Sequence, residues 1–226
     1  MALVLHLHPL SSYCWKVLAA LYEKGTPFKS VTVNLGDAAE RSAYLRLSPF
    51  GKIPALRDSD RGVEVFETSV IIEYLDLHYP GAVRLVPEAA DQALEVRLWD
   101  RIFDFYVMNA FQPIVNDRLR PAESRDPASV EMARANLRQA YAVIDKKLEG
   151  RAWAAGEAFS MADCAAAPAL FYAGIAEPIE AFPVATAYRQ RLLARPSVAR
   201  AIREATPFFR MFPATDEERA RMPVHP

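Results

Sequence analysis

The sequence has few cysteines, no surplus of charge of either sign and no long hydrophobic run, and each shortage excludes a class of protein. Its 226 residues include two cysteines, too few for the disulfide framework of a small secreted domain. The 27 basic and 28 acidic residues give a formal charge of -1, without the basic surplus typical of nucleic-acid-binding proteins. No segment approaches the roughly 20 apolar residues of a membrane-spanning helix, and residues 1–8 lack the features of a signal peptide. We expect a cytoplasmic protein that binds small molecules rather than nucleic acid or membranes.

The first 80 residues combine strand and helix patterns. Hydrophobic residues make up 52% of the chain, which is enough for a packed core. Pro9 ends a first alternating strand, and Ser11-Ser12 precedes a helix with apolar residues at three-to-four spacing that stops at Gly25. The predicted order is βαβαββα, with strands over 2–7, 28–33, 53–56 and 63–66 and further helices over 37–47 and 68–78.

Strand patterns end after residue 80. Residues 81–88 carry the proline and glycine typical of a linker. We predict an all-helical bundle over residues 89–212, with helices over 92–116, 127–149, 161–174, 183–194 and 197–205. Residues 213–226 are charged, flanked by proline and without a helical period, so we expect a loose or wrapping tail.

The first candidate site is the pair Ser11-Ser12, between the first strand and the first helix. Free backbone N–H groups and the helix dipole favour an anion at such a helix N-terminus. A hydroxyl there is suited to hold a thiolate, because lowering a thiol pKa by about 2 units requires only about 2.7 kcal/mol. Taken alone, the pair also fits two ordinary helix-capping serines.

A second candidate site is Gly51-Lys52-Ile53-Pro54, where a proline interrupts an apolar run. If the Ile53-Pro54 bond is cis, the turn presents the N–H and C=O groups of Ile53 to a peptide-like ligand. The alternative is an ordinary proline at the edge of a sheet.

A third candidate site is Glu67-Thr68-Ser69, directly before a predicted helix. Its hydroxyls and unpaired N–H groups suit a ligand carboxylate, and Glu67 suits an ammonium group, so the segment fits an amino-acid zwitterion. A plain capping segment remains the alternative. The similar pair Ser160 and Asp163 is interpreted as a capping box that starts a buried helix and acts on function only indirectly.

The order of these motifs along the chain resembles the cytosolic glutathione transferase superfamily. The resemblance covers nearly the whole chain, and Ser-Ser-x-x-Trp-Lys-Val is most similar to the serine-type theta, phi and zeta classes. It implies a thioredoxin-like domain over residues 1–80, glutathione as co-substrate, attack of the glutathione thiolate on a small hydrophobic electrophile, and a homodimer.

The resemblance also implies roles for individual residues. Ser11 corresponds to the serine that donates to the glutathione sulfur, with Ser12 as the neighbouring candidate. The rest of the tripeptide corresponds to the positions Lys52, Ile53, Pro54, Glu67 and Thr68. Thr68 stands where serine is usual and keeps the hydroxyl.

Position 13 and the two cysteines bear on alternative activities. Tyr13 stands where zeta isomerases have cysteine, which argues against maleylacetoacetate isomerisation. Cys14 corresponds to the second cysteine of the glutaredoxin Cys-x-x-Cys pattern, and Ser11 occupies the place of the attacking thiol. Cys164 lies among alanines on a helix expected to be buried. Isomerase, peroxidase and dehalogenase activities and a non-catalytic role in binding glutathione or another ligand remain as alternatives.

Aromatic and methionine side chains are the candidates for the walls of a second-substrate pocket. We select Trp15, three residues of the first long helix, and the aromatic run 208–212, although helical periodicity also allows many of them to lie in the core. The set is Trp15, Phe103, Tyr106, Met108 and Phe208. His6 and His8 have no partners at metal-ligand spacing, so we expect no metal site.

Overall fold

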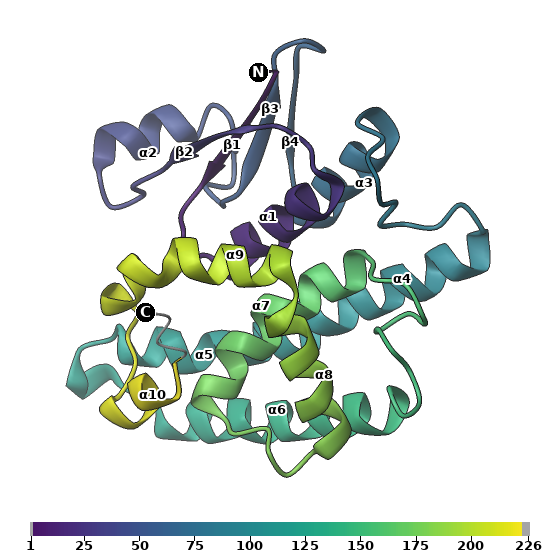
Figure 1. Cartoon of the computed structure of the whole chain (residues 1–226). Coiled ribbons are helices and arrows are strands. Elements are labelled where there is room, and N and C mark those ends of the chain that lie inside the picture. The colour runs from purple at the N-terminus through teal and green to yellow at the C-terminus, as the bar shows by residue number, and fades with distance from the viewer. Residues whose placement is uncertain (1, 223–226) are drawn as a thin grey trace.

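A four-stranded sheet with its helices occupies one end of the molecule, and helices alone make up the rest (Figure 1). The computed structural model describes residues 2–222. The sheet-containing part consists, in chain order, of β1 (Leu3–Leu7), α1 (Ser12–Lys24), β2 (Lys29–Thr32), α2 (Ala38–Tyr44), β3 (Ala55–Asp58), β4 (Val63–Phe66) and α3 (Thr68–His78). The predicted βαβαββα order is confirmed, and it forms a thioredoxin-like domain.

The sheet is mixed, with the strand order β2-β1-β3-β4. Strand β1 runs parallel to β2 and antiparallel to β3, so that Leu5 lies opposite both Ser30 and Leu56. Alternate residues Leu3, Leu5 and Leu7 of β1 are buried, as expected for a strand with one face toward the core. Strand β3 starts at Ala55, two residues later than predicted, directly after Pro54, which lacks the N–H needed for ladder pairing.

Helices fill the second part of the chain. They are α4 (Ala90–Ile102), the π-helical segment η1 (Phe103–Met108), α5 (Asn109–Arg118), the short 3-10 helix η2 (Ala122–Ser124), α6 (Pro127–Lys147), α7 (Met161–Ala176), α8 (Pro183–Ala194), α9 (Pro196–Ala205), the 3-10 helix η3 (Thr206–Met211) and α10 (Asp216–Arg221). The single helix predicted over 92–116 is thus two α-helices joined by a π-helical turn. Among the described residues, no helix is long and apolar enough to cross a bilayer.

Helix α7 is the centre of the molecule, and every one of its residues is buried. It packs against α1 of the sheet-containing part and against α4 and α8. Its first turn is held by Asp163, which accepts hydrogen bonds from the Ser160 backbone N–H at 2.8 Å and from the Tyr188 hydroxyl at 2.6 Å. The Ser160–Asp163 pair therefore fixes the start of the buried helix on which the first domain rests.

The segment 213–226 contains helix α10, where the sequence pattern predicts no helix. A capping box between Thr215 and Glu218 starts this helix, and Glu218 forms an ion pair with Arg118 of α5. The Arg221 guanidinium donates to the Ile175 carbonyl of α7 at 3.0 Å. These contacts wrap residues 213–222 around the helical part, while residues 223–226 of the predicted tail lie outside the described chain.

Candidate active site

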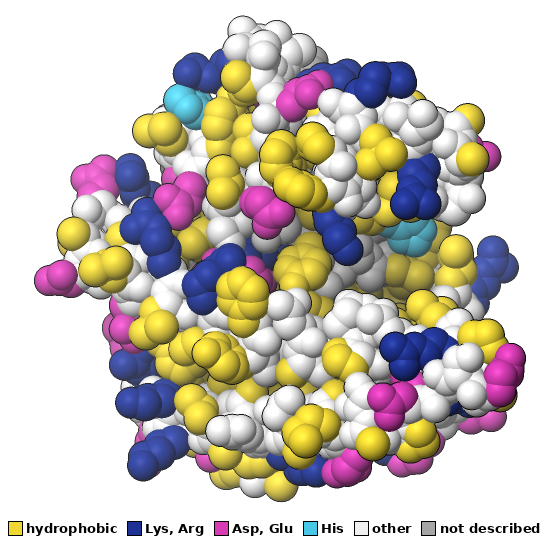
Figure 2. Space-filling view, turned by 180° about the vertical axis from the view of Figure 1, so that it is seen from behind, with side chains coloured by type: hydrophobic (Ala, Val, Ile, Leu, Met, Phe, Trp, Pro, Cys, Tyr) yellow, Lys and Arg dark blue, Asp and Glu magenta, His cyan; other side chains and the backbone are white. Residues whose placement is uncertain are grey.

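A cleft of about 560 Å³ runs between the sheet-containing part and helices α4 and α5. Figure 2 shows the face of the molecule hollowed between these two parts. Six of the residues selected from the sequence line this cleft, namely Ser11, Lys52, Ile53, Pro54, Glu67 and Thr68. They come from three loops of the first domain, which the sheet brings together at one edge.

Ser11 lies in the turn between β1 and α1 and is the N-cap of the helix. Its Oγ accepts a hydrogen bond from the Cys14 N–H at 3.3 Å. A serine hydroxyl has one O–H donor besides its acceptor lone pairs, so Ser11 caps the helix and still has a proton to donate into the cleft. Ser12 does not line the cleft and faces a narrow space beside Lys16 and Met108.

The backbone of the Ser11 turn is held from two directions. The Trp15 indole N–H donates to the Pro9 carbonyl at 2.5 Å, and the Tyr172 hydroxyl of α7 donates to the Leu10 carbonyl at 2.8 Å. Because both donors are buried aromatic residues, the position of Ser11 is set by the core of the protein rather than by the loop alone.

The Ile53-Pro54 corner lines the same cleft as this turn, and its peptide bond is cis. The preceding Lys52 carbonyl accepts hydrogen bonds from the hydroxyls of Tyr44 at 2.7 Å and Ser48 at 2.9 Å. Within residues 2–222, the N–H and C=O groups of Ile53 have no protein hydrogen-bond partner. They are therefore open to pair with the backbone of a peptide-like ligand.

The Glu67-Thr68 step joins β4 to α3. Glu67 is the only non-glycine residue of the described chain with positive φ, at 69°, a conformation that costs of order 1–3 kcal/mol and clusters at functional sites. It is the N-cap of α3 but makes no side-chain capping hydrogen bond. The N–H groups of the first turn of α3 thus remain available, and together with the helix dipole they favour an anionic group in the cleft.

A buried charge cluster joins this loop to the second part of the chain. Lys16 of α1 is 1% exposed and forms ion pairs with Asp100 at 2.6 Å and Asp104 at 2.8 Å. Arg101 pairs with the same two carboxylates, and the Ser69 hydroxyl donates to Asp100 at 2.7 Å. Burial raises the pKa of Asp104, which the neighbouring Lys16 and Arg101 oppose. Two cations therefore balance two carboxylates where the domains meet.

Two domain models of one family match the chain. "Glutathione S-transferase, N-terminal domain" matches residues 10–78, and "Glutathione S-transferase, C-terminal domain" matches residues 102–196. "Glutathione S-transferase 3" of Zea mays is 30% identical over 202 residues, which cover 86% of this chain and 90% of the maize protein. The chain belongs to the glutathione S-transferase family.

Solved structures of this family share the fold. A glutathione S-transferase from Methylobacillus flagellatus, crystallised with glutathione bound, is 27% identical and has a TM-score of 0.80; the match covers 88% of this chain and 98% of that one. A glutathione S-transferase from Methylobacterium radiotolerans, in complex with glutathione sulfonate, is 30% identical and has a TM-score of 0.77; here the match covers 88% and 93%. The family predicted from the motifs is confirmed, and the serine-type class remains a prediction.

The prediction of which residues line the second-substrate pocket of this family member is corrected in part. Trp15 and Phe103 are 1% and 0% exposed, and Met108 is 4% exposed, so these three are core residues with no surface for a substrate. Tyr106 lines a different groove, on the side of η1 that faces α6. Phe208 is partly buried, packs edge-on against His8 at 5.7 Å between ring centroids, and is not among the residues that line the cleft. Helical periodicity places apolar residues on one face of a helix, but it does not tell whether that face lies in the core or lines a pocket.

Sequence reasoning missed the residues of the second domain that do line the cleft. They are Arg101, Asp104, Phe105, Asn109, Gln112 and Asn116. Tyr13, from the first domain, also lines it, and its hydroxyl donates to Asn109 Oδ1 at 3.1 Å. The available signal was the 4-3-4 spacing of residues 105, 109, 112 and 116, which places them on one helical face.

The cysteines of this transferase-family chain lie in the core. Burial raises the pKa of Cys14 to about 12 and raises that of Cys164 well above its ordinary value. Both are free thiols, and thiols held protonated by burial are poor nucleophiles. Across residues 2–222 no group of three or more His, Cys, Asp or Glu side chains is arranged to hold a metal ion.

Proposed function

We propose that the chain is a glutathione transferase in which Ser11 activates the thiol of bound glutathione. The observation that carries the proposal is the meeting of the Ser11 turn, the Ile53-Pro54 corner and the N-terminus of α3 in one cleft. Glutathione is a peptide with a thiol, a γ-glutamyl end that carries both an ammonium and a carboxylate group, and a second carboxylate. Each of these groups has a partner of suitable chemistry in that cleft.

The tripeptide would be held by backbone groups and charges. Ile53 pairs with its backbone, and Lys52 supplies a cation for the carboxylate at the far end. The N–H groups of α3 and the Thr68 hydroxyl bind the γ-glutamyl carboxylate. Glu67 is exposed beside them and takes the γ-glutamyl ammonium group.

The chemical step would begin with the Ser11 hydroxyl donating to the sulfur of glutathione. A hydrogen bond to the thiolate and the positive end of the α1 dipole both favour the charged form, so the thiol loses its proton near neutral pH. The thiolate then attacks an electrophilic carbon held against α4 and α5. The sulfur–carbon bond forms as the bond to a leaving group breaks, or as a π-electron pair shifts to a neighbouring atom that takes a proton from water.

Calorimetric titration of glutathione and turnover of a general aromatic halide test the proposal together. We expect the wild type to bind and turn over, and Ser11→Ala to bind with similar affinity while kcat falls about 100-fold, in the range for removal of one donor to a developing anion. Ser12→Ala is the matched control and keeps its rate. Wild-type protein that does not bind glutathione would overturn the proposal, and loss of rate in Ser12→Ala rather than Ser11→Ala would reassign the serine.

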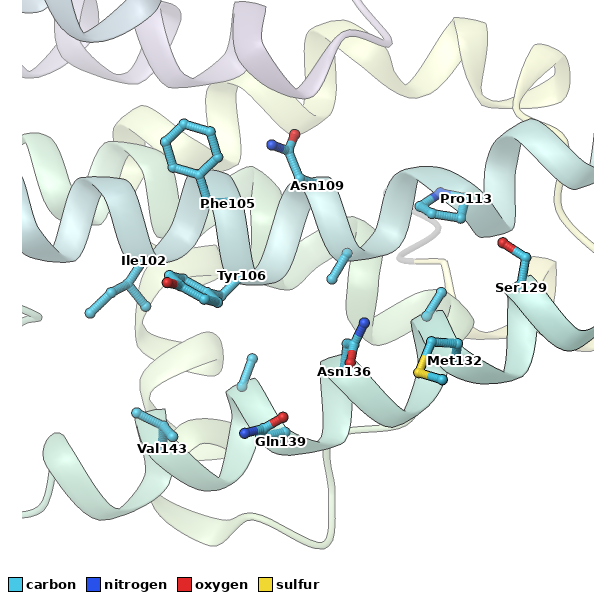
Figure 3. A pocket seen from close by; sticks show the side chains of 13 residues that line it. Ile102, Phe105, Tyr106, Asn109, Pro113, Ser129, Met132, Asn136, Gln139 and Val143 are labelled. Atoms are coloured by element: carbon cyan, nitrogen blue, oxygen red, sulfur yellow. The ribbon is translucent and has the colours of Figure 1, made fainter.

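We further propose that the chain acts as a homodimer. What supports this is an apolar face on the helical part: a groove of about 740 Å³ between η1–α5 and α6, in which Met132 is 63% exposed and Tyr106 66% exposed. Figure 3 shows Tyr106 pointing into this groove from η1 and Met132 facing it from α6. Exposed apolar surface of this extent is typical of an interface, and a second copy would cover it symmetrically.

Light scattering tests the dimer. We expect the wild type at twice the chain mass of 25.3 kDa and Met132→Glu largely at the single mass, because a charge in an apolar interface is costly. Met211→Glu is the control, since Met211 is equally exposed, at 61%, but lies outside the groove. A wild-type monomer would overturn the proposal.

A further inference from the structure

The peptide unit that joins Leu10 to Ser11 is held at both ends. Its N–H group, that of Ser11, donates to the His8 carbonyl at 2.9 Å. Its C=O group, that of Leu10, accepts from the Tyr172 hydroxyl at 2.8 Å. Because a peptide unit is planar, fixing both groups fixes the orientation of the whole plane. That orientation sets φ of Ser11, which is -76°, and with it the direction in which the serine hydroxyl points.

Tyr172 is the support of this plane that comes from the second domain. It lies in α7, 162 positions after Leu10, whereas the His8 carbonyl belongs to the turn itself. Among residues 2–222, no other group donates to the Leu10 carbonyl. Without the Tyr172 hydroxyl, this partly buried carbonyl would lose its partner, and an unpaired polar group in the interior is costly. The plane would turn toward another donor, and the Ser11 hydroxyl would turn with it.

The aromatic run 208–212 packs behind the side chains that support the turn. Three ring pairs make this contact, with centroids 5.7, 6.3 and 5.2 Å apart: Phe208 with His8, Phe209 with Trp15, and Phe212 with Tyr172. The second ring of each pair has a hydrogen bond to a backbone group of residue 9 or 10. Phe212 is buried and also stacks on Phe111 of α5. The end of the helical part thus keeps the supports of the Ser11 turn in place.

We infer that Tyr172 is a positioning residue for Ser11, because its hydrogen bond to Leu10 aims the serine hydroxyl at the sulfur of bound glutathione. The inference rests on the proposed function, in which Ser11 donates to that sulfur. Tyr172 is not among the residues that line the cleft, so it acts through the turn. A hydrogen bond weakens steeply when it is misaligned, so an aimed hydroxyl lowers the thiol pKa more than a displaced one does. The docking of the second domain therefore contributes to the acidity of the bound thiol.

The titratable groups around this hydrogen bond keep one charge state while the thiol titrates. Burial raises the pKa of Tyr172 well above its ordinary value and raises the pKa of the neighbouring Cys14 to about 12. Burial lowers the pKa of His8 from its ordinary value of 6.5, so this ring is neutral above that pH. The other rings packed on Tyr172 carry no charge, and they are Trp15, Phe111, Phe171 and Phe212. A shifted titration above pH 6.5 therefore reports on the thiol.

Tyr172→Phe tests the inference, because it removes the hydroxyl and keeps the ring. The measurement is the ultraviolet absorbance of the thiolate as the pH is raised, with the protein saturated with glutathione. We expect the pKa of the bound thiol to rise by about one unit, which lowers the thiolate fraction about tenfold at pH values below that pKa. The rate with the aromatic halide should fall in parallel at the same pH values.

Tyr141→Phe is the matched control. Tyr141 is similarly buried, and its hydroxyl also donates to a backbone carbonyl, that of Glu177 at 3.3 Å. It lies on α6, however, and does not line the cleft. We expect urea denaturation to show a comparable loss of stability in both variants, whereas the thiol pKa shifts only in Tyr172→Phe. A merely structural role of the Tyr172 hydroxyl would leave the thiol pKa unchanged.

Phe212→Leu tests the same support from behind and carries the test if Tyr172→Phe does not fold. The smaller side chain gives the Tyr172 ring room to move, and we expect the thiol pKa to rise by about half a unit, or about threefold in thiolate fraction. Phe159→Leu is the control, because this buried ring packs on Trp153 and does not line the cleft.

The outcomes separate the inference from the proposed function. A thiol pKa in Tyr172→Phe equal to that of the wild type, or one raised as much in Tyr141→Phe, overturns the inference alone. If Tyr172→Phe does not fold, an unchanged thiol pKa in Phe212→Leu does the same. A wild type that does not bind glutathione, or Ser11→Ala with the wild-type thiol pKa, overturns the proposed function and the inference with it.

Discussion

The two walls of the cleft are built in different ways. The wall from the first domain consists of loops and helix N-termini, and it presents backbone N–H and C=O groups at the Ile53 corner and at the start of α3. The wall from the second domain is one face of a continuous helical stretch, and it presents side chains such as Asn109 and Gln112. A backbone-built wall suits a constant ligand such as glutathione, whereas a side-chain wall is changed by single substitutions. Variation in substrate choice is therefore expected on the second wall.

The buried Lys16 joins the two walls through its ion pairs with Asp100 and Asp104. Lys16→Met would leave Asp100 and Asp104 with Arg101, the more exposed of their two cations, and removing one partner of a buried ion cluster costs about 3–5 kcal/mol. We expect urea denaturation to give a free energy of unfolding lower by that amount. Lys146→Met, an exposed position on α6, should change it by less than about 0.5 kcal/mol. Equal stability of the two variants would show that the walls are assembled independently of the cluster.

Cys14 lies three residues after Ser11 but is buried in the core behind the first wall. Its pKa is raised by burial from 9.0 to about 12, which lowers the thiolate fraction at neutral pH about a thousandfold. We expect neither cysteine to react with a disulfide reagent in the native protein and both to react after unfolding. The folded state holds the Cys14 proton more tightly than the unfolded chain does. Its contribution to stability is therefore complete below pH 9 and lost as the pH rises toward about 12. Rapid labelling of Cys14 at pH 7 without unfolding would contradict this assignment.

Thr68 tests the backbone-built wall at a position where a side chain also contributes. Thr68→Val keeps the shape and removes the hydroxyl, and one hydrogen bond to a charged group is worth about 1.5 kcal/mol, so the Kd for glutathione should rise about tenfold. Thr68→Ser keeps the hydroxyl and should bind as the wild type does. Calorimetry decides between the two, and unchanged affinity in Thr68→Val would assign glutathione recognition here to the N–H groups of α3 alone.

Tyr13 provides the smallest expected effect, because it acts on the second wall through another residue. Tyr13→Phe keeps the ring and removes the hydroxyl that donates to Asn109 at 3.1 Å. The loss of one hydrogen bond of about 1 kcal/mol should lower kcat/KM for the aromatic halide about fivefold. Glutathione affinity should not change. A shift in the Kd for glutathione instead would place Tyr13 on the first wall.

Local signals explain why the first wall could be predicted and the second could not. Proline at 54, the serines at 11 and 12, and the hydroxyl before α3 each act within a few residues, and turns and caps leave such marks in the sequence. Asn109 and Gln112 carry no such mark, because any exposed helix has polar residues at the same spacing. The structure places three of the residues selected for the second wall, Trp15, Phe103 and Met108, in the core. The other two selected residues were Tyr106 and Phe208.

The sequence by itself determined the element order, the helix and strand periods and the family motifs, since these depend on backbone preferences and on side chains a few positions apart. It also marked residues 53–54 and 67–68 as candidate ligand contacts, with an edge proline and a capping segment as the alternatives. Only the tertiary structure decided which of Ser11 and Ser12 lines the cleft and which face of α5 completes it. Those choices depend on how α1 and α4 pack around α7, and packing is set by contacts between residues about a hundred positions apart, such as Lys16 and Asp104.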